Sequence, residues 1–129
     1  MSEDNMTFWK RFVAGWKDCS VIASLEADLY PIGGSKWGEE PVEIEYTTFA
    51  SGRTQLEIEI ERKLKVPVGD NISIWINGVK LIEIPITGSK QDIQLNSTNG
   101  DSIPEISLGD RATVQHNGNP ILEGKFKRD

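Results

Sequence analysis

The chain has 129 residues, a mass of 14.4 kDa and a formal net charge of −6 at pH 7. This length fits one domain, and hydrophobic residues at 37% and charged residues at 26% suit a soluble protein with one core, which excludes disordered, collagen-like and coiled-coil chains. The acidic balance repels nucleic acid and anionic lipid, so DNA and RNA are not expected partners and a membrane is an unfavourable one.

The first residues and the cysteine content point to a compartment. The chain begins Met-Ser-Glu-Asp-Asn without the basic and apolar stretches of a secretory signal, and no apolar run approaches the length of a membrane span. Cys19 is the single cysteine, so it cannot close an intrachain disulfide, and we read it as a buried spectator. We expect a cytoplasmic protein.

The helical period of apolar residues runs through residues 6–18. The positions i, i+3, i+4 and i+7 are Trp9, Phe12, Val13 and Trp16. This stripe predicts a short amphipathic helix within 1–19 that packs on a single all-β domain formed by 20–129. Docking on a partner protein and anchoring at a membrane surface are the alternatives for the stripe. Burial against the protein's own sheet is favoured, because the helix is short and the protein is acidic.

From Ser20 the apolar period changes to two, which is typical of a strand with one solvated face. The apolar positions are Val21, Ala23, Leu25, Ala27 and Leu29. Residues 31–41 follow, and their three glycines and two prolines predict a loop. Lys36 and Trp37 in this loop are a cation and a flat aromatic, which suit holding a phosphate or stacking a sugar. A tryptophan folded back on the sheet is the favoured reading, with a recognition loop as the alternative.

Residues 42–46 and 56–61 alternate apolar and acidic side chains and predict a hairpin. The outward positions are Glu43, Glu45, Glu57, Glu59 and Glu61. Facing carboxylates destabilise a sheet by a few tenths of a kcal/mol per pair. The ordinary explanation is a solvated face protected against aggregation, with a basic residue from 62–65 folding across it. The alternative is a surface for a basic partner.

The Asn77-Gly78 dipeptide predicts a two-residue hairpin turn, because both residues tolerate positive φ. Apolar residues change phase after this turn, so either both faces of the hairpin are covered or a bulge near Leu81 resets the register. Further short strands are expected at 90–95, 111–116 and 121–127. The sequence therefore predicts an all-β fold, an antiparallel sandwich or flattened barrel of about eight strands with the N-terminal helix.

Residues 67–127 contain a pattern of turns and strand edges. Its segments are Gly69-Asp70-Asn71-Ile72-Ser73-Ile74-Trp75-Ile76-Asn77-Gly78-Val79, Asn99-Gly100-Asp101-Ser102-Ile103-Pro104, Leu108-Gly109-Asp110 and Ile121-Leu122-Glu123-Gly124-Lys125-Phe126. This pattern resembles a small β domain found in uncharacterised bacterial proteins. The resemblance implies an all-β fold of roughly six strands, and it implies no activity, cofactor or catalytic residue.

Residue types that carry catalysis or bind metals are scarce. His116 is the single histidine and stands at an expected strand end, where capping a turn is favoured over catalysis. Asp70, Asp101 and Asp110 stand in turns without the spacing of a calcium loop, and such aspartates commonly bond their own backbone. We predict no enzyme activity, no cofactor and no metal.

The leading function is a non-enzymatic binding or assembly module that acts through a protein–protein surface. The acidic hairpin and the Trp37 loop are the contact candidates, and the partner is another protein or a second copy of the chain. A small-ligand or carbohydrate-binding domain using Trp37 and Trp75 is the first alternative. A hydrolase of unfamiliar design and a peripheral membrane protein are the others.

Overall fold

The computed structural model describes residues 20–129. This part of the chain contains no α-helix, and none of its elements is a long apolar helix able to cross a membrane. The predicted helix lies outside the described residues, together with Cys19 and the stripe Trp9, Phe12, Val13 and Trp16. Its packing therefore stays a prediction.

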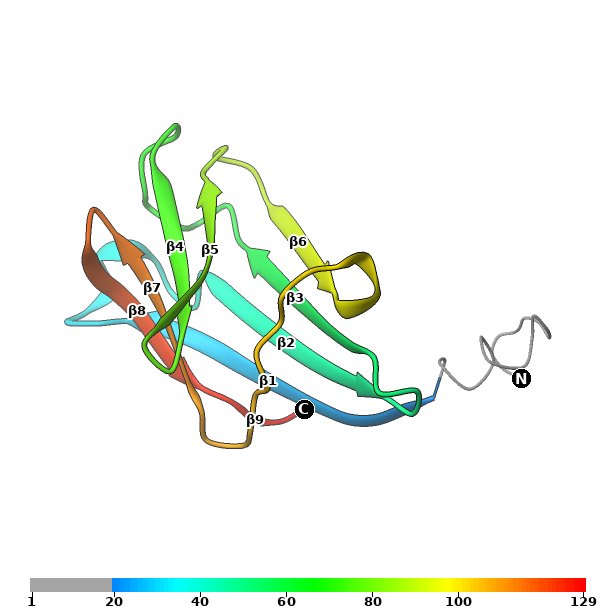
Figure 1. Ribbon diagram of the computed structural model, residues 1–129. Helices are drawn as coiled ribbons and strands as arrows, with labels where there is room; N and C mark the ends of the chain where they lie inside the picture. The colour runs from blue at the N-terminus through cyan, green and yellow to red at the C-terminus, as the bar shows by residue number, and fades with distance from the viewer. Residues whose placement is uncertain (1–19) are drawn as a thin grey trace.

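The strands follow one another with two short 3₁₀ turns between them (Figure 1). They are β1 (Val21–Pro31), β2 (Val42–Phe49), β3 (Thr54–Ile60), β4 (Asn71–Ile76), β5 (Val79–Pro85), β6 (Gln91–Asn96), β7 (Arg111–His116), β8 (Asn119–Lys125) and β9 (Lys127–Arg128), with η1 (Ser35–Trp37) in the predicted loop and η2 (Ser97–Asn99) after β6. The sheet order is β5-β4-β7-β8-β1-β2-β3-β6, all antiparallel, and β9 pairs with β1.

The all-β prediction is confirmed, but one curled sheet forms a half-barrel where a sandwich or a flattened barrel was expected (Figure 1). Strands β5 and β6 are its two ends and do not pair with each other. Residues 101–107 run across the open side, and Ile106 from this segment is buried in the core. Leu64 and Val66, which follow β3, join the same core. Coil segments therefore cover apolar residues that a second sheet would cover in a sandwich.

The acidic hairpin forms as predicted, with Glu43 opposite Glu59 and Glu45 opposite Glu57. Its inward side chains are fully buried or nearly so: Val42, Ile44, Tyr46, Leu56, Ile58 and Ile60.

In β1 the alternation holds at Ala27 and Leu29, which are buried, while Val21 is 55% exposed. A register shift between Val21 and Ala23 accompanies the change, because a bulge re-aims the residues before it.

The Asn77-Gly78 turn is confirmed, with φ angles of 49° and 81° at its two residues. Strand β4 pairs Ile74 with Ile82 but Trp75 with Lys80, so Leu81 is the extra residue of a bulge. Of the two explanations for the change of phase, the bulge near Leu81 is therefore confirmed. After the bulge the alternation starts again, and Ile84 is buried.

The hairpin β7–β8 repeats β4–β5 at an offset of 40 residues. Asn117 and Gly118 have φ angles of 53° and 79°, so β8 begins at Asn119 and the predicted start at 121 is wrong. The register shift also recurs, with Ile121 as the extra residue. The same backbone bond closes each copy: the Ile86 N–H donates to the Asp70 carbonyl at 2.9 Å, and the Phe126 N–H to the Asp110 carbonyl at 2.8 Å.

The copies differ where β8 meets β1. Gly124 occupies the position of the buried Ile84, and a Cβ atom there would lie 2.3 Å from the Asp28 carbonyl oxygen of β1. Only glycine permits this approach of two backbones. The close contact joins the two hairpins to the β1-β2-β3-β6 half of the sheet.

Candidate functional site

Cross-strand pairing brings seven carboxylates to the outward side of β1, β2, β3 and β6. Two rows run across the strands, because residues directly opposite in an antiparallel sheet share a face. The first row is Glu26, Glu45 and Glu57, and the second is Asp28, Glu43, Glu59 and Asp92. We call these seven residues the acidic face. Glu61 follows β3, and the hollow of about 80 Å³ on this face is lined by the other four predicted glutamates.

Little positive charge neutralises the acidic face. Lys127 lies 3.2 Å from Asp28, and no ion pair within residues 20–129 joins Arg62, Lys63 or Lys65 to this surface. Asp129 adds a further carboxylate, which accepts a 3.0 Å hydrogen bond from the Ser24 hydroxyl.

Crowding changes the protonation of these groups. Hydrogen bonding to Asp129, aided by burial and neighbouring negative charge, raises the pKa of Glu26 and of Glu45 to about 7. Burial and the charges of Asp28 and Glu59 raise the pKa of Glu43. The pKa of Asp129 is lowered instead, because its carboxylate accepts a hydrogen bond from Glu45. Near neutral pH the surface therefore holds protons that isolated glutamates would release.

Two triads on this surface bring carboxylate oxygens within 4.8 Å of one another: Glu26, Asp28 and Glu43, and Glu57, Glu59 and Asp92. Oxygen ligands at such spacing suit a hard cation, but Ca²⁺ takes six to eight of them. Three carboxylates leave the rest of such a shell to water or bidentate binding. Exposed acidic groups commonly gather without a metal, and the absence of a metal stays a prediction.

The Trp37 ring is packed on the protein. It meets His116 in a T-shaped arrangement with ring centroids 5.6 Å apart, and the Lys36 ammonium lies over the Trp37 ring at 4.9 Å from its centroid. The Trp37 carbonyl accepts a hydrogen bond from the Lys65 N–H at 3.2 Å. Gly38 makes this docking possible, since a Cβ atom there would stand 2.6 Å from the Lys63 carbonyl oxygen. This contact matches the favoured reading of a tryptophan folded back.

His116 is 8% exposed, and its Nε2 lies 2.9 Å from a carboxylate oxygen of Asp70. In the second copy, Asp110 instead accepts from the Ser107 N–H at 2.7 Å. The equivalent residue in the first copy is Pro67, which has no N–H to donate, and this explains why Asp70 bonds elsewhere.

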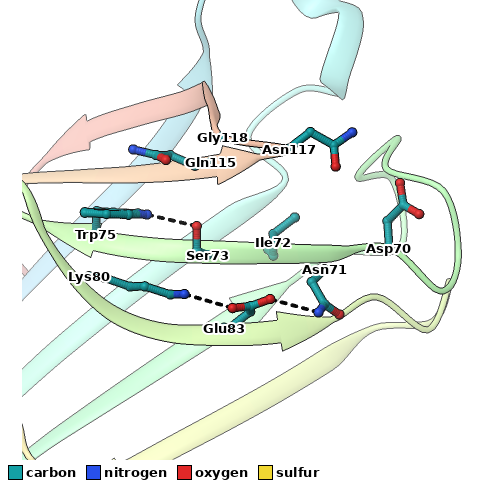
Figure 2. Close-up of a pocket in the computed structure, with 10 residues that line it drawn as sticks. All are labelled: Asp70, Asn71, Ile72, Ser73, Trp75, Lys80, Glu83, Gln115, Asn117 and Gly118. Carbon is teal, nitrogen blue, oxygen red and sulfur yellow. Dashed lines mark hydrogen bonds and ion pairs between the residues drawn. The ribbon is translucent and has the colours of Figure 1, made fainter.

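A second candidate surface is a hollow of about 430 Å³ on the outward side of β4, β5 and β7 (Figure 2). Figure 2 shows Trp75 beside Ser73 on β4, with Lys80 and Glu83 of β5 on one side and Gln115 of β7 on the other. We call it the Trp75 hollow; it is lined by Asp70, Asn71, Ile72, Ser73, Trp75, Lys80, Glu83, Gln115, Asn117 and Gly118. Trp75 faces outward whereas Trp37 packs against the inward-facing His116, so the two tryptophans lie on opposite faces of the sheet.

The sequence reasoning missed contributors to both surfaces. Glu26 and Asp28 alternate in β1 just as the hairpin glutamates do, and that pattern could have added them to the acidic face. Asp92 carries no such signal, because its inclusion depends on β3 pairing with β6. The sequence predicted a turn between the strands at 111–116 and 121–127, and the repeat of the Asn-Gly dipeptide could have shown that it is a two-residue turn like Asn77-Gly78.

Comparison with known proteins adds no assignment, since no protein-family model and no curated protein matches the chain.

Proposed function

We propose that the protein is a non-enzymatic binding module that holds a basic protein partner on its acidic face. The supporting observation is the register that aligns seven carboxylates in two rows across four strands with one lysine paired to them among the described residues. Folding alone gives no reason for this arrangement, because the repulsion costs stability.

The partner is a different protein with lysines or arginines on the contacting surface. A second copy docking through the same face about a two-fold axis would place carboxylates against carboxylates. Proton release from Glu26 and Glu45 strengthens the attraction as pH rises through about 7.

The test uses a defined cation, a synthetic octalysine peptide, titrated by calorimetry at two salt concentrations. At pH 8, above the raised pKa of Glu45, the variant Glu45→Gln with Glu57→Gln removes two adjacent charges from the face and is expected to weaken binding several-fold. Binding by the unmodified protein should also weaken with salt, because the Debye length falls from roughly 10 Å at 0.1 M to 3 Å at 1 M.

The matched control is Glu39→Gln with Glu105→Gln, which changes net charge equally at exposed residues outside β1, β2, β3 and β6. Binding should survive this change with little loss. Equal weakening by both double variants would show that the overall field, rather than the acidic face, attracts the peptide, and would overturn the assignment.

A further inference from the structure

We propose that the Trp75 hollow is a binding site for a neutral saccharide, separate from the acidic face. A volume of about 430 Å³ lies within the range of roughly 300–1,000 Å³ that small-molecule sites occupy. Its lining combines one large aromatic side chain with amide, hydroxyl and charged groups, which matches a sugar ring's apolar C–H surface and its hydroxyl rim.

Trp75 provides the apolar surface. Its indole N–H donates to the Ser73 hydroxyl at 2.9 Å, so the side chain's polar atom is already satisfied within β4. That bond holds the ring beside Ser73 on the outward side of the sheet (Figure 2). The half-buried ring thus offers carbon surface in a fixed orientation, and fixing it beforehand reduces the entropy lost on binding.

Some polar side chains of the hollow are already hydrogen-bonded within the protein, and others are free to bind a ligand. Glu83 accepts from Lys80 at 2.8 Å through one oxygen and from Asn71 at 2.9 Å through the other. By contrast, the side-chain amides of Gln115 and Asn117 have no partner within residues 20–129. Each amide offers donors and an acceptor, as paired recognition of sugar hydroxyls requires.

The second hairpin shows which of these residues folding needs. It forms the same turn and bulge, and Arg111 reaches Glu123 at 3.2 Å just as Asn71 reaches Glu83. Yet Gln115 occupies the position of Trp75, and the hollow beside Glu123 measures about 170 Å³. The tryptophan and the larger hollow are therefore additions to a hairpin that folds without them.

Charge selects a neutral ligand. The one ammonium in the lining, that of Lys80, is paired with Glu83, and the net charge of −6 repels anions. A phosphorylated or sulfated sugar would need a cation that the lining does not leave unpaired.

The experiment titrates ¹⁵N-labelled full-length protein with the neutral hexasaccharides of cellulose, xylan, amylose and chitin, followed by the indole N–H and side-chain amide resonances. At least one probe is expected to shift the Trp75 indole together with the Gln115 and Asn117 amides. Trp75→Gln, which copies the second hairpin, should keep the melting temperature and weaken binding about tenfold, since loss of aromatic contact accounts for a factor of that order.

Tyr30→Gln is the control, because Tyr30 is an exposed aromatic in a different hollow of about 320 Å³. It should leave binding unchanged. The proposal is overturned if none of the four probes shifts these resonances, if Trp75→Gln binds as well as the unmodified protein, or if a sulfated hexasaccharide binds more tightly than every neutral one.

Discussion

The two halves of the sheet satisfy their outward polar groups in opposite ways. In the β5-β4-β7-β8 half, Glu83 is held by Lys80 and Asn71, and Glu123 is held by Arg111. In the β1-β2-β3-β6 half, glutamate faces glutamate at Glu26–Glu45, Glu43–Glu59 and Glu45–Glu57. The inward sides of both halves bury apolar residues alike.

This difference shows that apolar burial on the inward side of the sheet stabilises the fold in both halves. The outward side can therefore hold residues that do not stabilise it. A paired outward surface stabilises modestly, and a row of like charges costs a little. Outward residues that do not stabilise the fold are therefore candidates for binding, and they are found at the acidic face and at Trp75.

The largest expected effect comes from breaking the junction between the halves. Gly124→Ala places a Cβ atom against the Asp28 carbonyl oxygen, so β8 and β1 must separate, and unfolding free energy should fall by about 3 kcal/mol. Denaturant unfolding measures the loss. Gly52→Ala, at a turn glycine with φ of 92° and nothing within 4 Å of the added Cβ, should cost only the backbone strain of about 1–2 kcal/mol. Equal costs would show that the junction tolerates movement.

The two turns of the hairpin half should respond alike to a β-branched residue. Gly78→Val and Gly118→Val each force valine to φ near 80°, with no neighbouring atom within 4 Å of the added Cβ, so the backbone strain alone should cost at least about 1 kcal/mol. Thermal unfolding of both variants provides the measurement. An unchanged melting temperature in either one would contradict the requirement for glycine at that turn.

The asparagines before these glycines should differ. The Asn77 side-chain oxygen accepts from the Arg111 N–H of β7 at 3.0 Å, whereas the Asn117 amide has no partner within residues 20–129. Asn77→Ala should therefore cost about 1 kcal/mol more than Asn117→Ala, the usual worth of one hydrogen bond. Chemical denaturation of the pair would reveal the difference, and identical losses would remove the tertiary role of Asn77.

The smallest expected effect is a difference between the two halves in how stability depends on pH. Because the pKa of Glu45 is raised to about 7, its contribution to stability is fully present below its unfolded pKa of about 4.5 and is lost as pH rises through 7. Glu45→Gln should raise stability at pH 8 by a few tenths of a kcal/mol and change it least near pH 5.

The contribution of Glu83 to stability changes with pH in the opposite direction. Hydrogen bonding to Lys80 and Asn71 lowers its pKa, so its contribution is present above its unfolded pKa and is lost as pH falls through the folded value. Glu83→Gln should reduce stability at pH 8 rather than raise it. Melting curves of both variants from pH 4 to pH 8 test the contrast, and parallel curves would show that crowding on the acidic face has no energetic consequence.

The sequence by itself determined the elements that depend on neighbours along the chain. A period of two predicted the strands, the Asn77-Gly78 dipeptide predicted a turn, and the phase change near Leu81 predicted the bulge as one of two solutions. Each of these signals is local, because alternation and positive φ act within a few residues.

Only the tertiary structure decided which strands became neighbours. Pairing of β3 with β6 added Asp92 to the acidic face, and pairing of β1 with β8 required glycine at 124. Docking of the loop after β1 against His116 placed Trp37 on the inward side of the sheet, opposite the face that carries Trp75. These outcomes depend on contacts between distant segments and on side-chain packing across the core, which no local period encodes.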